Sequence, residues 1–298
     1  MQVATTKIIP RIFGGIGNQL FCYAAARRLA VVNGAELIID NISGFSHDHT
    51  YQRQYQLDNF NIPCRTATAI ERLQPFSRVR RHLKRAYNRR LEFENRKYIQ
   101  QDGMDFEPRL LSLKPTATTY LEGYWQSEDY FKDAEQTIRS DLQIKAPNDN
   151  KNLATLIEVQ QYLSIAVHIR FFDPPEDNGH HNTSRIYYIN AISKMEKLFP
   201  NAHYFIFSDR PNDARNYIPL PDERMTLISH NKGDTNAYAD LWLMTQCQHF
   251  IIANSTFSWW GAWLGKNSKK VIITPSVILD GKTAWGFKGL IPETWIKI

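Results

Sequence analysis

Short apolar runs alternate with longer segments of helical periodicity along most of the chain. Six runs have the length and the β-branched or aromatic content of buried strands: 7–13, 36–40, 164–167, 204–207, 250–253 and 270–274. Helical spacing follows in four segments: 20–32, 186–199, 238–249 and 257–264. Strands that alternate with helices predict parallel sheets covered by helices, and therefore an α/β fold.

The chain length and one polar segment predict two domains. A chain of 298 residues is too long for one small core. The segment 145–152, KAPNDNKN, has the composition of a linker, so we place a boundary between domains 1–150 and 151–298. No apolar run reaches 18 residues, the start lacks a signal-peptide pattern, and the three cysteines suit a reducing compartment. These features predict a cytoplasmic protein.

A glycine-rich turn joins the first predicted strand to the first predicted helix. Residues 14–19 read GGIGNQ, and glycines there let backbone N–H groups approach a phosphate or sugar at a helix N-terminus. Gly15, Gly17 and Asn18 are therefore candidate residues for binding a phosphate or a sugar. The nicotinamide-dinucleotide pattern G-x-G-x-x-G fails, because Leu20 stands where its third glycine belongs.

Polar residues follow three strands of the second half. His168 and Arg170 end the first, Asp209 follows the second, and residues 254–256 follow the third. Ligands bind at the carboxyl ends of parallel strands, and a guanidinium or a helix N-terminus suits phosphate. Each group also has a structural interpretation: Arg170 paired with a carboxylate, Asp209 as a helix cap, Ser255 or Thr256 as another. Their convergence on one edge with Asn254 favours a nucleotide diphosphate site.

Two other segments carry a functional and a structural interpretation. The segment 120–130 gathers aromatic residues. Either Trp125 and Gln126 are candidates for binding an acceptor sugar, or the segment forms a core-facing aromatic turn.

The segment 78–90, RVRRHLKRAYNRR, holds seven of the basic residues and no acid, so the remainder of the chain carries −1 of the net +6. It predicts an amphipathic helix that contacts an anionic membrane, or a solvated helix whose apolar stripe packs on the core. Nucleic acid is disfavoured because no aromatic-studded binding pattern accompanies the charge.

The chain resembles the family-11 glycosyltransferases, the α-1,2-fucosyltransferases. The resemblance rests on GGIGNQLFCYAAARRLA at 14–30, RQYQLDNFNI at 53–62, EGYWQSEDYFKD at 122–133, HIRFFD at 168–173, FSD at 207–209 and ADLWLMTQCQHFIIANSTFSWWGAWL at 239–264. It implies a GT-B fold, with two Rossmann-like domains facing a central cleft. The N-terminal domain would lie on the acceptor side, and the C-terminal domain would bind GDP-fucose.

The resemblance also implies inverting transfer of L-fucose to the 2-hydroxyl of a terminal β-galactoside, on an oligosaccharide or lipid-linked glycan, without a metal. No two aspartates are spaced as D-x-D, so Arg170 and the helix N-terminus at Ser255 are expected to stabilise the leaving diphosphate. The family pattern has a second arginine where Phe171 and Phe172 stand. Asp173 fills the family position and is the expected general base, with Glu176 second.

Three alternatives remain open at this point. A GT-B enzyme with another nucleotide sugar or linkage would share the same strand-end residues. A nicotinamide-dependent dehydrogenase would use the glycine turn, and a non-catalytic carbohydrate-binding module would need the aromatic segment without a phosphate site. Because Arg170 and the turn at Asn254 favour phosphate, fucosyl transfer is the main hypothesis.

Overall fold

The computed structural model describes residues 6–46, 48, 52–172, 182–279 and 282–298. The chain divides into two compact units: unit 1 contains residues 1–143 and 288–290, and unit 2 contains residues 144–287 and 291–298. The observed division falls before the predicted linker, whose last residues belong to helix α5, Asn150–Gln161, capped by Asp149. Residues 288–290 return to unit 1 through hydrogen bonds of Lys288 with Phe106 and Asp105.

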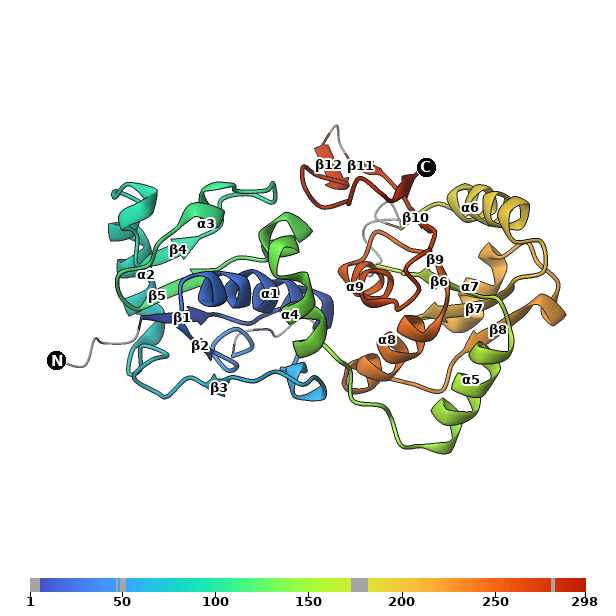
Figure 1. Cartoon of the computed structure of the whole chain (residues 1–298), viewed down its shortest axis with the longest axis horizontal. Coiled ribbons are helices and arrows are strands. Elements are labelled where there is room, and N and C mark those ends of the chain that lie inside the picture. Colours follow the sequence, from blue (N-terminus) through green and yellow to red (C-terminus); the bar gives the residue numbers. More distant parts are fainter. Residues whose placement is uncertain (1–5, 47, 49–51, 173–181, 280–281) are drawn as a thin grey trace. The chain divides into compact units, whose positions relative to one another are not determined.

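Unit 1 is built on a five-stranded parallel sheet in the order β3-β2-β1-β5-β4. Its strands are β1 Lys7–Pro10, β2 Glu36–Ile39, β3 Arg65–Thr66, β4 Tyr98–Gln100 and β5 Thr119–Glu122. Its α-helices are α1 Ile16–Val32, α2 Ser77–Asn88, α3 Arg109–Ser112 and α4 Glu135–Asp141. Figure 1 shows α1, in blue, lying along β1.

Helix α1 is buried on most sides because the sheet and α4 both pack against it. Its alanines, Ala24, Ala25 and Ala26, are almost inaccessible to solvent and allow this close approach. The turn before it needs a glycine at position 14, since Gly14 has a φ of +77° and an added Cβ would lie 2.9 Å from the side chain of Asn18.

Unit 2 contains a six-stranded parallel sheet in the order β13-β10-β9-β6-β7-β8 and a small antiparallel pair, β11-β12. The strands are β6 Ser164–Ile169, β7 His203–Ser208, β8 Met225–Ile228, β9 His249–Ile251, β10 Ile272–Thr274, β11 Val277–Leu279, β12 Lys282–Trp285 and β13 Ile296–Lys297. The other α-helices are α6 Arg185–Leu198, α7 Pro211–Ala214, α8 Ala237–Gln246 and α9 Thr256–Leu264.

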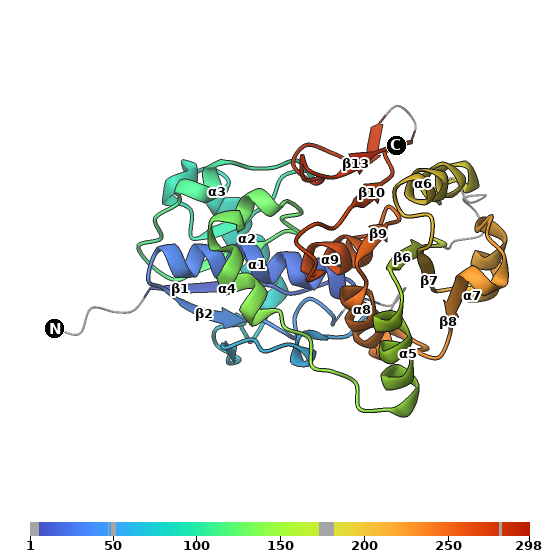
Figure 2. The same ribbon diagram turned by 45° about the vertical axis from the view of Figure 1, so that its right-hand side comes forward.

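Helices cover both faces of the six-stranded sheet. Ile165 and Val167 of β6 belong to one core cluster with Tyr188 and Ala191 of α6. Alternate residues of a strand face opposite sides, and His168 lies against Phe257 of α9, with ring centroids 5.1 Å apart. Helix α8 lies beside α5 and α9, as Figure 2 shows. Each unit is thus a Rossmann-like α/β layer structure, and the predicted α/β fold class is confirmed.

The basic segment forms helix α2, but it does not pack as a solvated helix with its apolar stripe on the core. Its apolar stripe does not pack on the core: Val79, Leu83 and Tyr87 are 57%, 61% and 64% exposed. The inward residues are Arg81 and Asn88, which are buried. The basic side of α2 faces inward because unit 1 has buried carboxylates, as well as apolar side chains, where the helix packs.

Candidate active site

The strand order places the candidate residues of unit 2 at a topological switch point. The chain runs outward from β6 through β7 to β8, and then returns to place β9 on the other side of β6. In parallel sheets of this kind, ligands bind outside the carboxyl ends of the two strands where the order reverses. His168 and Arg170 lie at the end of β6, and Asn254 follows β9.

Arg170 is paired with Asp209 in this structure. The register of β6 and β7 places Ile169 opposite Ser208, so the two residues leave the sheet side by side. Arg170 Nη1 lies 2.5 Å from Asp209 Oδ2, and the backbone N–H of Phe171 donates to Asp209 Oδ1 at 3.1 Å. Asp209 therefore orients Arg170. The helix-cap interpretation of Asp209 fails, because Arg210 is the N-cap residue of α7 and, among the described residues, no side-chain capping hydrogen bond is found there.

His168 is a buried imidazole with one unsatisfied nitrogen. Its side chain is almost inaccessible, and no described residue provides a hydrogen-bond partner for Nδ1. Burial, with a smaller contribution from the positive charge of Arg170, lowers the pKa of His168 to about 3. The ring is therefore neutral near pH 7. Because buried polar atoms are nearly always paired, an orphaned nitrogen beside a cationic side chain points to a ligand.

The N-terminus of α9 supplies backbone donors at the same edge. Ser255 is the N-cap residue, but its side chain makes no capping hydrogen bond within the described residues, and Thr256 is already the first residue of the helix. The structural interpretation of Ser255 or Thr256 as a side-chain cap is therefore wrong. The first-turn N–H groups of a helix have no partners within it and attract anions.

Two residues that no sequence motif singles out hold this edge in place. The hydroxyl of Thr183 donates to Asn254 Oδ1 at 2.8 Å, and Thr183 is buried. The hydroxyl of Tyr188 donates to the carbonyl oxygen of His168 at 3.1 Å. Both come from the segment at the start of α6, where a lone threonine and a helical tyrosine carry no motif.

Unit 1 has a second switch point, between β1 and β5. The glycine turn follows β1, and Gly15 is the N-cap of α1 without a side-chain cap. Gly17 is buried in the first turn. Asn18 Oδ1 accepts a hydrogen bond from Gln126 Nε2 at 2.8 Å, which joins the glycine turn to the segment after β5.

Trp125 contributes to the core of unit 1 and does not form a sugar-binding surface. Its indole is 1% exposed and packs edge-on against Tyr130. The backbone of Trp125 has a φ of +54°, a conformation that is costly for a bulky residue. This geometry turns the indole inward, and the core-facing interpretation is confirmed for Trp125. The neighbouring Gln126 instead donates its hydrogen bond to Asn18.

Asp173 and Glu176, the candidates for the general base, lie outside the described residues. Among the residues that are described, no group of three or more His, Cys, Asp or Glu side chains is placed to hold a metal ion. In the same part of the chain, no helix is long and apolar enough to cross a membrane.

The switch point of unit 2 suits a nucleotide diphosphate, because it brings together a guanidinium, a neutral imidazole and free helix amides. Comparison with known proteins identifies the class as glycosyltransferase. The profile described as glycosyl transferase family 11 matches residues 62–284. The chain belongs to this family, and the resemblance seen in its motifs is confirmed.

The relatives and the fold agree with the family. An α-1,2-colitosyltransferase of Escherichia coli is 27% identical over 298 residues, covering 98% of both chains. A galactoside 2-α-L-fucosyltransferase of Caenorhabditis elegans is 29% identical over 201 residues, covering 64% of this chain and 56% of that protein. The structure of a variant of Arabidopsis thaliana FUT1 in complex with GDP matches 93% of this chain and 72% of its own, with a TM-score of 0.54 and 13% identity. The fold is therefore of GT-B type.

Proposed function

We propose that this glycosyltransferase transfers L-fucose from GDP-fucose to the 2-hydroxyl of a terminal β-galactoside, with inversion at the anomeric carbon. The observation that carries the proposal is the orphaned Nδ1 of buried His168, next to Arg170 at the uncapped N-terminus of α9. These groups match the charge and hydrogen-bonding capacity of a donor diphosphate. The named relatives, which transfer fucose or colitose, support the choice of sugar.

The donor is proposed to bind along the edge of unit 2. Arg170 can hold two phosphate oxygens with its planar fork, and the first amides of α9 can donate to the same group. Asp209 accepts one hydrogen bond on each oxygen, from Arg170 and from Phe171. A carboxylate has about four acceptor sites, so Asp209 retains capacity for the N1–H and amino group of guanine.

The chemistry is proposed to need no metal. Breaking the bond between fucose and phosphate places negative charge on the departing diphosphate and positive charge on the sugar ring. Arg170 and the α9 amides are fixed by strand and helix backbone, so they can meet the diphosphate charge without rearranging. Inversion requires attack from the opposite face, with a base that takes the proton of the galactose hydroxyl. Asp173 is proposed as that base from its family position, with Glu176 as the second choice.

The segment that contains Trp125 and Gln126 is proposed to lie on the acceptor side, with Gln126 as the contact because the indole of Trp125 is buried. Gln126 donates one hydrogen bond to Asn18 and retains a second N–H and its amide oxygen for a sugar hydroxyl. Gly15, Gly17 and Asn18, at the N-terminus of α1, are proposed to bind the donor.

Colitose is a second candidate for the transferred sugar. The specific observation is the end-to-end match with the α-1,2-colitosyltransferase of Escherichia coli. Colitose is fucose without its 3-hydroxyl, so the same diphosphate site can serve either donor. The difference then lies in the groups that meet the 3-hydroxyl, because a site built to bond a hydroxyl discriminates strongly against a sugar that lacks it.

A transfer assay tests the proposal. The protein is incubated with GDP-fucose or GDP-colitose and a β-galactoside such as lactose, and the product is analysed by NMR. We expect a new α-linkage on O2 of galactose. Transfer only from GDP-colitose would select the second candidate. Glycan binding without GDP binding or turnover would instead identify a carbohydrate-binding module, and a product with retained configuration would contradict the inverting mechanism.

A further inference from the structure

Helix α2 presents an apolar stripe to solvent. Val79, Leu83 and Tyr87 recur every four residues and therefore share one side of the helix. Each is more than half exposed, and Phe76, directly before the helix, is 75% exposed. Exposed apolar side chains that gather on one face mark an interaction site more often than scattered ones.

The opposite side of α2 explains why the stripe faces outward. Arg81 pairs with Asp40 at 3.0 Å, and the two side chains are 9% and 5% exposed. Arg85 bonds both oxygens of Glu122, which is also buried. Removing one partner of a buried ion pair is costly, so these pairs fix the rotation of the helix about its axis. The outward stripe is therefore a fixed feature of the folded unit.

Basic residues lie beside the stripe and at both of its ends. Helical spacing places Arg80 and Lys84 along one border, whereas Arg78 precedes Val79 at the N-terminal end and Arg90 follows the end of the helix at Asn88. All four are exposed. Within the described residues, none of these four forms an ion pair with a carboxylate, and the sequence has no acid between Glu71 and Glu92. Their charge is available to an external anionic surface.

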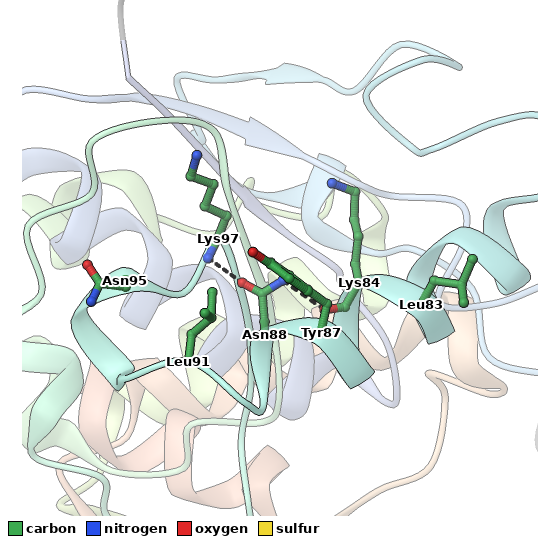
Figure 3. Close-up of a pocket in the computed structure, with 7 residues that line it drawn as sticks. All are labelled: Leu83, Lys84, Tyr87, Asn88, Leu91, Asn95 and Lys97. Atoms are coloured by element: carbon green, nitrogen blue, oxygen red, sulfur yellow. Dashed lines mark hydrogen bonds between the residues drawn. The ribbon is translucent and has the colours of Figure 1, made fainter.

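A shallow groove of about 480 Å³ begins at the C-terminal half of the stripe, with Leu83 and Tyr87 in its lining, and extends to Lys97. Figure 3 shows Lys84 and Lys97 extending to the same side of this groove, with Tyr87 among its lining residues. Leu83 and Leu91 contribute the apolar part of the lining. Two ammonium groups above an apolar floor match a phosphate headgroup attached to an acyl chain.

We propose that the outer face of α2 is a docking surface for a lipid bilayer that contains anionic lipids. The apolar stripe would lie in the interface between headgroups and acyl chains, while the flanking Arg and Lys side chains meet lipid phosphates. This inference goes beyond sugar transfer and does not depend on the donor or acceptor.

The geometry favours a bilayer over nucleic acid. A nucleic acid phosphate backbone would use the basic residues but would leave a central stripe of valine and leucine without a partner. An amphipathic helix at a bilayer uses both, because apolar burial and attraction to anionic lipids add.

Vesicle co-sedimentation of the full chain tests the proposal. The probes are vesicles of phosphatidylcholine alone and of phosphatidylcholine with phosphatidylglycerol. We expect binding to the anionic vesicles that weakens as salt rises. Changing Arg78, Arg80, Lys84 and Arg90 to Gln is expected to lower it by about three orders of magnitude, from about 1 kcal/mol for each of the charges removed. Arg81 and Arg85 stay unchanged because they carry the internal ion pairs.

A second variant separates bilayer docking from general charge attraction. Val79, Leu83 and Tyr87 are changed to Gln, and binding to anionic vesicles is expected to fall about ten-fold or more. Binding of this variant to a DNA duplex should equal that of the native protein. The matched control for the charge variant changes four exposed lysines of unit 2, Lys151, Lys194, Lys197 and Lys269, to Gln.

Three results would overturn the proposal. The first is vesicle binding that stays unchanged in the apolar variant. The second is an equal loss of vesicle binding in the unit 2 control and in the charge variant. The third is tighter binding of the native protein to DNA than to anionic vesicles. Melting temperatures and circular dichroism of all variants establish that each remains folded. The substituted side chains are exposed, so we expect little change in either measurement.

Discussion

At the scale of single residues, the pair of Arg170 and Asp209 determines how the proposed donor site is prepared. The carboxylate of Asp209 lies 2.5 Å from the guanidinium of Arg170 and orients it. An arginine fixed in this way loses less side-chain freedom when a phosphate arrives, which is the advantage of a preorganised site. The pairing and a catalytic role are therefore compatible, although the sequence presented them as alternatives.

The first prediction concerns Arg170→Lys. A lysine keeps the charge but cannot grip two phosphate oxygens, and the charge it meets grows as the sugar–phosphate bond breaks. We expect kcat to fall by about 10²–10³, with a smaller loss of GDP affinity. Turnover is measured per folded molecule, alongside the melting temperature. A normal kcat in a protein that melts at a lower temperature would show that Arg170 is purely structural.

The second prediction concerns Asp173→Asn. An amide cannot accept the proton of the acceptor hydroxyl, so turnover should fall by about 10²–10⁴ while GDP affinity stays nearly constant. Glu176→Gln is the comparison variant. Turnover that stays within a few fold in Asp173→Asn, together with a large loss in Glu176→Gln, would assign the base to Glu176.

The sequence predicted the chemistry of single residues better than their environments. His168 lies near the end of β6, and Arg170, Asp209 and Asn254 follow strands of the same sheet, as expected, because strand ends are readable from apolar runs. The sequence left a sugar-facing and a core-facing Trp125 open, since the choice depends on a left-handed backbone that only the folded turn imposes.

At the scale of elements, apolar patterns located strands β1, β2, β6, β7, β9 and β10 and helices α1, α6, α8 and α9, while the ends and rotations of the elements needed the structure. The predicted strand 7–13 ends at Pro10, and the predicted helix from residue 20 begins at Ile16, because Gly15 can serve as its N-cap. The basic segment is helical as predicted, yet its inward side carries Arg81 and Arg85. Periodicity alone assigns the apolar stripe to the core, because it does not show the buried carboxylates Asp40 and Glu122.

The third prediction tests the buried ion pairs that orient α2. Arg81→Met removes the partner of Asp40 and the hydrogen bond from Arg81 to the carbonyl of Arg72. Loss of one partner in a buried pair costs about 3–5 kcal/mol, so the melting temperature should fall by about 5 °C or more. Arg78→Met, on the exposed side, is the control. Equal melting temperatures for the two variants would contradict the proposed anchoring of α2.

At the scale of the whole molecule, the alternation of strands and helices predicted two parallel α/β units, but it could not predict every crossing of the chain. Residues 288–290 return to unit 1 after a long passage through unit 2, held by contacts at Asp105 and Phe106. No local sequence pattern predicts this return of the chain to unit 1. The strand orders are equally non-local, and they place the candidate residues of each unit at a switch point.

The fourth prediction concerns metal. Arg170 and the α9 amides are proposed to supply the positive field that a cation supplies in other transferases. Transfer activity should therefore persist after treatment with excess EDTA, measured with the same donor and acceptor. Complete loss on chelation, followed by recovery with Mn²⁺ or Mg²⁺, would reject the metal-independent mechanism.

The central claim is that the switch-point edge of unit 2 binds a guanosine diphosphate through Arg170, His168 and Asp209. Titration calorimetry of GDP, IDP and UDP into the native protein and Asp209→Asn tests it most directly, because IDP lacks only the guanine amino group. The native protein should prefer GDP, and Asp209→Asn should lose about 1–3 kcal/mol of GDP binding together with the preference over IDP. Equal binding of all three nucleotides by the native protein would contradict the account.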